Sequence, residues 1–433
     1  MESYSLATKA IHSDHRFSGP EVSANISVST TFKHPTPEEK AVKPEGYYDT
    51  AWTPNEPSRD IYSREGQPTL TRAEKVLEGI IGHPTIVYPS GINAFFALLL
   101  HVNPDVIAIG TKDGPGYHGC HGAIEVYLRT KKLDEKTAKI SIDDDFPSDG
   151  RKVLCWLETP LNPTGESYSI EAYAKKIHAI PGGVLGIDST FAPPPLQDPF
   201  KNGADIVMHS GTKYFAGHSD TLIGTLSVRT TDEWLKLWSD RTYTGGVPGS
   251  LDVWLLLRSL RTLNVRVTRQ AKTATALAHW LHSLTPENFD KSGEDAVKGM
   301  KGMVKKVYHT SLQPDAADLI AEDGSKQMTV GPACFSMLLE SEVAAEYLGS
   351  RLQLFFHATS LGGVESLIEH RIISDSHCDP KLHRMSIGLE DLEDLKQDFR
   401  QAFEKVAEVS THIRITKIMH ALNDSQAIVS TVQ

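Results

Sequence analysis

Hydrophobic residues in the first 65 positions follow no regular period. Prolines interrupt this stretch, and proline breaks helices and removes a hydrogen bond from strands. We therefore expect residues 1–64 to form an arm that lacks a core of its own. They include Pro35, Pro37, Pro44, Pro54 and Pro57.

The pattern becomes helical after residue 65. Leu70, Ala73, Leu77 and Ile80 fall on one face of a helix, and Gly82 is a typical stop. Short apolar runs then alternate with helical segments, as in βαβ units whose strands are buried on both faces. This predicts a large three-layer α/β/α domain with a mostly parallel sheet over 65–262. The expected strands are TIVYP (85–89), DVIAIG (105–110), KVLCWLET (152–159), VLGID (184–188) and ADIVMHS (204–210), with helices from Ser90 and around 170–180.

A shorter α/β pattern follows a long amphipathic stretch over 253–284. It contains ACFSMLLE (333–340), LQLFFHATSLGG (352–363) and a closing helix over 390–409. We expect a smaller C-terminal α/β domain over 263–433.

Composition argues against a nucleic-acid-binding, disulfide-rich, secreted or membrane-spanning protein. Acidic residues number 55 against 44 basic ones, a formal charge of −11, which argues against a nucleic-acid partner. Four scattered cysteines make no disulfide framework, the first residues lack the apolar segment of a secretory signal, and no apolar run is long enough to cross a membrane. We expect a cytoplasmic protein of enzyme size.

The stretch ADIVMHSGTKYFAGHSDTLIGTLSV (204–228) is the most informative. We expect its buried strand to end at Met208, with polar residues directly after it. Ligands in open α/β sheets bind beyond the carboxyl ends of strands. The hydroxyls of Ser210 and Thr212 could hold a phosphate and leave the Lys213 amine for nucleophilic work. An isolated lysine in a turn is more often a surface residue.

Asp188 ends another predicted buried strand. A carboxylate beside a lysine fits pyridoxal 5'-phosphate (PLP), in which the lysine forms a Schiff base and the acid partners the pyridinium nitrogen. Taken alone, Asp188 could equally cap the end of its strand.

Ordered motifs along nearly the whole chain make it resemble the cystathionine γ-synthase-like family of fold-type-I PLP enzymes, the trans-sulfuration enzymes of cysteine and methionine metabolism. No single motif would suffice. The motifs are LATKAIH (6–12), YSREGQPT (62–69), YPSGINA (88–94), ETPLNPTG (158–165), IDSTFAPPPLQDPFKNGADIVMHSGTKYFAGHSD (187–220), LLLRSLRTL (255–263), SLGGVESLIEH (360–370) and RMSIGLEDLEDL (384–395).

The resemblance implies roles for the cofactor residues. Lys213 would carry the internal aldimine and shuttle protons, and Asp188 would keep the pyridine nitrogen protonated. The helix that opens at Ser90, Gly91 and Ile92 would bind the phosphate through its amides, as helix N-termini bind anions. The resemblance also implies that the hydroxyls of Ser210 and Thr212 bind the phosphate. Tyr62 and Arg64 of a neighbouring subunit in a homotetramer would bind the same phosphate. Tyr117 would stack on the pyridine ring and could act as a base.

The resemblance also implies a substrate site. Arg384 would bind the substrate carboxylate in bidentate fashion, with Asn162 near it and Ser360 positioning the lysine. In isolation, Tyr62 and Tyr117 could simply pack, and Arg384 could make a structural ion pair. His118, Cys120 and His121 match no ordinary zinc spacing, so we expect no metal site, and no GxGxxG motif supports a Rossmann fold.

The chain departs from the family around the distal substrate pocket. Thr359 stands where members that handle cystathionine usually have an acidic residue, and Gly122 where they tend to have arginine. Phe32 replaces a frequent tyrosine, and EHRIISDSHCDP (369–380) replaces the usual HPAxMTH stretch. These changes put cysteine in doubt as a co-substrate.

The leading hypothesis is γ-substitution on an O-acyl-L-homoserine, acetyl rather than succinyl, through a vinylglycine-type ketimine. The nucleophile would be a thiol, sulfide or a carbon nucleophile such as an enolate. Alternatives are a cystathionine γ-synthase that uses cysteine, or a γ-lyase of cystathionine or methionine type that releases a 2-oxo acid and ammonia. A non-enzyme alternative is a silent subunit of a PLP-enzyme oligomer, against which intact Lys213, Asp188 and Arg384 argue.

Overall fold

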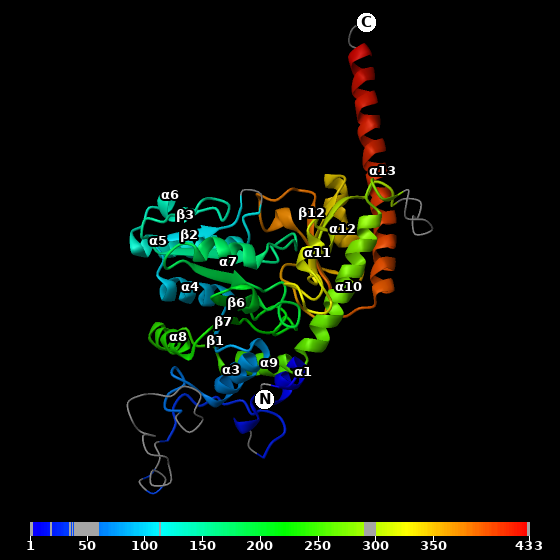
Figure 1. The fold of residues 1–433 in the computed structure, drawn as a ribbon. Helices are drawn as coiled ribbons and strands as arrows, with labels where there is room; N and C mark the ends of the chain where they lie inside the picture. Colours follow the sequence, from blue (N-terminus) through cyan, green and yellow to red (C-terminus); the bar gives the residue numbers. More distant parts are fainter. Residues whose placement is uncertain are drawn as a thin grey trace. The chain divides into compact units, whose positions relative to one another are not determined.

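The structure is a computed structural model that describes residues 3–17, 20–33, 36, 38, 60–111, 114–289 and 300–430, with side chains to residue 412. The described residues form two compact units (Figure 1). Pro35, Pro37, Pro44, Pro54 and Pro57 of the predicted arm lie outside the described residues. The expected limits 1–64, 65–262 and 263–433 stay predictions. The first unit falls within Met1–Asn162, Ser167–Thr268 and Asp318–Thr329, and the second within Pro163–Glu166, Arg269–Ala317 and Val330–Gln433.

The first unit contains a seven-stranded sheet in the order β1-β7-β6-β5-β4-β2-β3. The pairs among β2 to β6 are parallel, and β7 runs antiparallel to both β1 and β6. The predicted mostly parallel α/β sheet is therefore confirmed. The strands are β1 (Thr85–Tyr88), β2 (Val106–Ile109), β3 (Lys139–Ile140), β4 (Val153–Glu158), β5 (Val184–Asp188), β6 (Ile206–Ser210) and β7 (Gly224–Val228).

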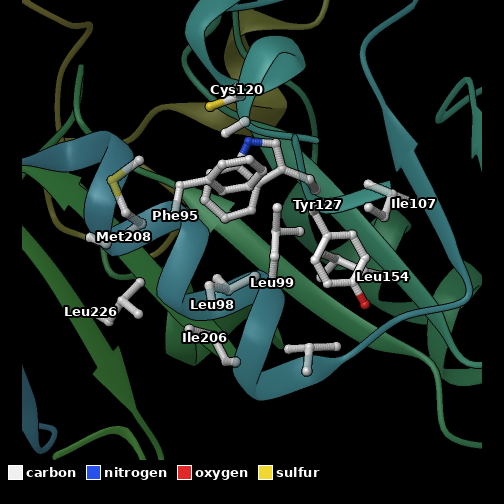
Figure 2. Close-up of a cluster of buried hydrophobic side chains, with 14 of the residues drawn as sticks. Phe95, Leu98, Leu99, Ile107, Cys120, Tyr127, Leu154, Ile206, Met208 and Leu226 are labelled. Carbon is white, nitrogen blue, oxygen red and sulfur yellow. The ribbon is translucent and has the colours of Figure 1, made fainter. Parts of the chain in front are cut away.

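Helices cover both faces of this sheet, as a three-layer domain requires. One buried cluster joins α4, α5 and α8 to alternate strand residues such as Trp156 and Met208, and Figure 2 shows part of it. The other residues of the same strands, such as Cys155 and Val207, pack with α7 on the opposite face. The helices of this region are α1 (Leu6–His12), α3 (Pro68–Ile81), α4 (Gly91–Val102), α5 (His118–Lys131), α6 (Glu135–Ala138), α7 (Ile170–His178), α8 (Thr231–Thr244) and α9 (Ser250–Leu260).

One predicted strand limit differs from the structure. Strand β6 continues past Met208 to Ser210, because the antiparallel neighbour β7 pairs Ser210 with Gly224. The amphipathic stretch over 253–284 contains two helices: α9 ends at Leu260, and α10 (Leu263–Ser283) begins after a two-residue break.

The second unit contains a five-stranded sheet in the order β10-β11-β12-β9-β8. Its pairs are antiparallel except for β10 with β11. Its strands are β8 (Val304–Tyr308), β9 (Cys334–Leu339), β10 (Phe356–His357), β11 (Leu367–His370) and β12 (Leu382–Ser386), and its helices include α12 (Glu342–Arg351) and α13 (Leu392–Ser430).

Helix α13 is longer than predicted. It was expected to end near Val409 and continues to Ser430, because residues 410–430 contain neither glycine nor proline to stop it. Within the part of the chain that the structure describes, no helix combines the length and apolarity needed to cross a membrane.

Candidate active site

Three neighbouring strands bring polar side chains to one edge of the first unit's sheet. Glu158 at the end of β4 lies opposite Asp188 at the end of β5, and Asp188 lies opposite Met208 near the end of β6. By strand alternation these ends share the face on which α4 packs, since Trp156, Ile206 and Met208 belong to the cluster with α4. The predicted gathering of polar residues at the carboxyl edge is therefore present.

The N-terminus of α4 lies directly against this edge. The Ser90 hydroxyl caps the helix by accepting a hydrogen bond from the Asn93 amide at 3.0 Å. A Cβ at Gly91 would approach the Ser210 Oγ to 3.2 Å, and one at Gly224 would clash with the Ser90 carbonyl oxygen at 2.1 Å. The first amides of a helix have no acceptor within it, so those of Gly91 and Ile92 could receive an anion beside Ser210, and the predicted phosphate role stays a prediction.

Lys213 follows β6 in a turn that the backbone holds. Its amide donates to the Ser210 carbonyl at 3.1 Å, and its carbonyl accepts from the Gly217 amide at 2.7 Å. The Thr212 hydroxyl accepts from the Ile223 amide at 2.9 Å, which ties the turn to the start of β7. The lysine and both predicted phosphate hydroxyls thus belong to one short, braced segment.

Asp188 is a buried carboxyl group, with 7% of its surface exposed. Its Oδ1 accepts a hydrogen bond from the Thr190 amide at 2.9 Å. Burial raises the pKa of Asp188 to about 6, against the hydrogen bonds from Thr190 and the charge of Lys213, which lower it. A buried acid of this kind gains from a cationic partner, and a pyridinium nitrogen is such a partner.

Glu158 is a site residue that the sequence reasoning missed. One of its oxygens accepts from the Tyr117 amide at 2.8 Å, and the other accepts from the Asn162 amide at 2.7 Å. It therefore fixes the backbone of two predicted site residues. Its position directly after a buried strand, like that of Asp188, was the signal that could have found it. We call Ser90, Gly91, Ile92, Glu158, Asp188, Ser210, Thr212 and Lys213 the carboxyl-edge cluster.

Tyr117 precedes α5 and stands beside α4. A Cβ at Gly119 would lie 2.5 Å from the Tyr117 ring and 3.0 Å from the Ile92 side chain, so both side chains flank Gly119. The Tyr117 residue is 37% exposed, which leaves ring surface for stacking. The predicted stacking role stays a prediction.

Tyr62 and Arg64 lie elsewhere in the first unit. The Arg64 guanidinium carbon is 5.5 Å from the centre of the Tyr62 ring, and its Nη1 donates to the Thr242 carbonyl at the end of α8 at 3.2 Å. Their role toward a neighbouring subunit stays a prediction.

The predicted substrate residues Thr359, Ser360 and Arg384 lie in the second unit. Arg384 is buried on β12, where its Nη2 donates to the Ser360 carbonyl at 3.0 Å and also contacts the Glu369 carboxylate. The structural ion pair weighed as an alternative for Arg384 is thus present. Thr359 is exposed.

The carboxyl-edge cluster fits PLP. The α4 amides with the hydroxyls of Ser210 and Thr212 suit its phosphate, Asp188 suits its pyridine nitrogen, and Lys213 suits its aldehyde. When bound, PLP supplies an electron sink for a substrate carbanion. His121 contacts the Pro115 carbonyl at 2.7 Å and Cys120 is buried, and the described residues include no group of three side chains that could hold a metal ion.

Comparisons with known proteins agree with this geometry. The family model described as Cys/Met metabolism PLP-dependent enzyme matches residues 7–404. Cystathionine γ-lyase of Saccharomyces cerevisiae is 31% identical over 94% of this chain and 98% of its own length, and cystathionine β-lyase MetC of Bacillus subtilis is 30% identical over 94% and 98%. The solved structure of apo CalE6, a methionine γ-lyase from Micromonospora echinospora, has a TM-score of 0.74 at 29% identity over 93% of this chain and 100% of its own.

The family model spans most of the chain, and both curated relatives align along nearly its full length. The fold agrees with the fold-type-I expectation. The chain therefore belongs to the PLP-dependent enzymes of cysteine and methionine metabolism.

Proposed function

We propose that this protein is a PLP-dependent γ-lyase, which removes the γ-substituent of a homocysteine- or homoserine-type L-amino acid and releases a 2-oxo acid and ammonia. The observation that carries the proposal is the carboxyl-edge cluster, in which Lys213, a buried Asp188 and an anion site meet at one sheet edge. Relatives named as cystathionine and methionine γ-lyases support elimination over the acyl-homoserine substitution that the sequence analysis put first.

Each proposed role uses a group of this chain. The Lys213 amine holds the cofactor and then moves protons at the substrate's Cα and Cβ. The Asp188 carboxylate holds the proton of the pyridine nitrogen, and Tyr117 stacks on the ring. Arg384 binds the substrate carboxylate through charge-assisted hydrogen bonds, with Asn162, Thr359 and Ser360 around the substrate.

The test is product analysis with purified, PLP-loaded full chain. L-cystathionine, L-methionine, L-homocysteine and O-acetyl-L-homoserine are each supplied alone, and ammonia and 2-oxo acid are quantified. We expect both products in equal amounts from at least one amino acid, and none from Lys213→Ala. Consumption of an amino acid only when a second nucleophile is present would overturn the lyase proposal.

A second candidate is γ-substitution on an O-acyl-L-homoserine, most simply O-acetyl-L-homoserine, by a thiol, sulfide or carbon nucleophile. Two positions favour it. Gly122 is exposed on α5, where a Cβ would meet nothing within 4 Å, and Thr359 is exposed and uncharged. A site without these two charges lacks charge-assisted contacts, each worth about 1.5–3 kcal/mol, for the far amino-acid head of cystathionine or cysteine.

Introducing charges at positions 122 and 359 tests the argument for the substitution candidate. Gly122→Arg with Thr359→Glu should lower the KM for cystathionine, or for cysteine as nucleophile, about tenfold or more. Gly122→Ala is the matched control, because it changes the same helix position without charge. Mass spectrometry of products from O-acetylhomoserine with cysteine, sulfide and an enolate donor identifies any substitution, and an unchanged KM in the charged variant would remove the argument from these positions.

We also propose that active sites are shared between subunits of a homotetramer, with Tyr62 and Arg64 completing the neighbour's phosphate site. Lys213→Ala and Arg64→Ala chains would each be inactive alone. Refolded together they should regain about a quarter of wild-type activity, because half of the dimers would carry one intact site. No regain on mixing would place Arg64 in its own chain's site, and an Arg64→Ala chain that is active alone would place Arg64 outside any site.

A further inference from the structure

An ion pair joins two neighbouring strands of the second unit, β11 and the central strand β12. Glu369 on β11 and Arg384 on β12 lie directly opposite each other, and they are only 4% and 6% exposed. The Arg384 Nη2 contacts the Glu369 Oε2 and donates to the Ser360 carbonyl at 3.0 Å. Ser360 itself has a left-handed backbone, with φ of 80°. The Nη2 of the Arg384 guanidinium is therefore held by a carboxylate and a carbonyl.

A second arginine shares the same carboxylate. The Arg371 Nη1 donates to the Glu369 Oε1 at 2.9 Å, and the Ser374 hydroxyl donates to that same oxygen. Arg371 is 5% exposed, and its Nη2 lies 3.7 Å from the Asp375 Oδ2. We call Glu369, Arg371, Ser374, Asp375 and Arg384 the arginine network. All but Arg384 lie in the segment 369–380, which departs from the family pattern.

The number of arginines that share the Glu369 carboxylate decides how much positive charge Arg384 has left to attract a substrate carboxylate. A buried carboxylate that loses one of two cationic partners is balanced by the remaining one alone. Burial works to lower the pKa of Arg371, but nearby groups led by the Glu369 carboxylate outweigh it and the pKa is raised. Arg371 is thus a permanent cation. With Arg371 present, the two arginines balance the carboxylates of Glu369 and Asp375, whereas without Arg371 the network would carry a net charge of −1 beside the substrate carboxylate.

We propose that Arg371 is a positioning residue for substrate binding: by sharing Glu369 it preserves the attraction of Arg384 for a substrate carboxylate, while Glu369 positions the guanidinium. The ligand class is an α-amino acid with a free carboxylate. The inference rests on the proposed role of Arg384 as the carboxylate-binding group. It adds that Glu369 and Arg371, which lie outside the carboxyl-edge cluster, set how strongly Arg384 binds that carboxylate.

The experiment is a double-mutant cycle on the PLP-loaded full chain. Arg371→Met should raise the KM of the best wild-type substrate about tenfold and change kcat less than about twofold, because only carboxylate binding is weakened. Arg371→Lys should recover part of the loss, since it keeps the charge without the planar fork. In a Glu369→Gln background, Arg371→Met should cost little, because no uncompensated carboxylate remains to neutralise Arg384.

A control variant and two binding and stability measurements show whether a change in KM comes from carboxylate binding. Arg351→Met, on α12 of the same unit and over the Tyr347 ring, is the matched control and should leave KM unchanged. Calorimetric titration with glycine, which has the α-carboxylate but no γ-substituent to eliminate, reports amino-acid binding without release of product. Thermal unfolding of each variant shows that the fold survives.

The outcomes distinguish the two proposals. A wild-type chain that binds glycine but converts no amino acid overturns the proposed function, while weaker glycine binding by Arg371→Met still supports the inference. An active wild type whose Arg371→Met variant keeps the wild-type affinity for glycine overturns the inference alone. So does an equal penalty from Arg371→Met in the wild-type and Glu369→Gln backgrounds.

Discussion

The carboxyl-edge cluster and the arginine network hold charge in two different ways. In the first unit, backbone does most of the work: helix amides, strand ends and a turn bring Lys213 and Asp188 to one sheet edge. In the second unit, side chains hold one another, since Glu369 lies between Arg371 and Arg384. Backbone-built sites depend on where elements begin and end, whereas side-chain networks depend on every partner. The two regions should therefore respond differently to substitution.

The largest expected effect is at Lys213. Lys213→Ala removes the amine that holds PLP and moves protons, so turnover should fall by about 10³-fold or more. The visible absorbance of covalently attached PLP should vanish, while PLP still binds through the phosphate site. Retained turnover in this variant would remove Lys213 from the chemistry. Lys201→Ala, an exposed lysine of the same unit, is the control.

Glu158 tests whether the backbone-built site has one side chain on which it depends. Glu158→Ala leaves the amides of Tyr117 and Asn162 without their acceptor, and each lost bond costs about 1–3 kcal/mol. We expect kcat/KM to fall about 100-fold. Glu158→Gln keeps one acceptor oxygen and should lose less.

The exposed Glu125 on α5 provides the control, since Glu125→Ala should leave kcat/KM unchanged. A Glu158→Ala variant that equals the wild type would show that Tyr117 and Asn162 hold their places without it.

The sequence predicts the first region far better than the second. Ser90, Asp188 and Lys213 stand at the ends of apolar runs, and the carboxyl ends of parallel strands necessarily meet at one edge. The end of β6 was misplaced at Met208, because its pairing with β7 depends on a strand distant in sequence.

The arginine network could not be predicted from the sequence. Segment 369–380 was recognised as a departure from the family, yet its letters do not reveal that Glu369 faces Arg384 across two strands. That register is set by the pairing of β11 with β12. The contact between Glu369 and Arg371 also depends on the directions of their side chains, which the hydrophobic periodicity of the sequence does not predict.

Asp188 should give the backbone-built region a pH signature. Its folded pKa of about 6 lies above the ordinary value, so the folded, cofactor-free chain binds the proton more tightly than the unfolded chain does. Its contribution to stability is therefore full at low pH and is lost as pH rises from about 4 through 6. Asp188→Asn should remove this fall and stabilise the cofactor-free chain above pH 7 by about 2–3 kcal/mol.

Urea unfolding between pH 4 and 8 measures the Asp188 effect. The exposed Asp145→Asn variant should follow the wild type. With PLP bound, Asp188→Asn should instead weaken cofactor affinity, and identical pH profiles for Asp188→Asn and wild type would contradict the assigned pKa.

The smallest effect compares one helix cap from each unit. The Ser90 hydroxyl accepts from the Asn93 amide at 3.0 Å, and the Ser341 hydroxyl caps α12 by accepting from the Ala344 amide at 3.1 Å. Either serine changed to alanine should cost about 1 kcal/mol of unfolding free energy. Only Ser90→Ala should also weaken PLP binding, by about tenfold, because α4 supplies the anion site. Fluorescence titration of the cofactor-free variants with PLP measures this affinity. Equal PLP affinity in the two variants would show that the Ser90 cap of α4 does not contribute to phosphate binding.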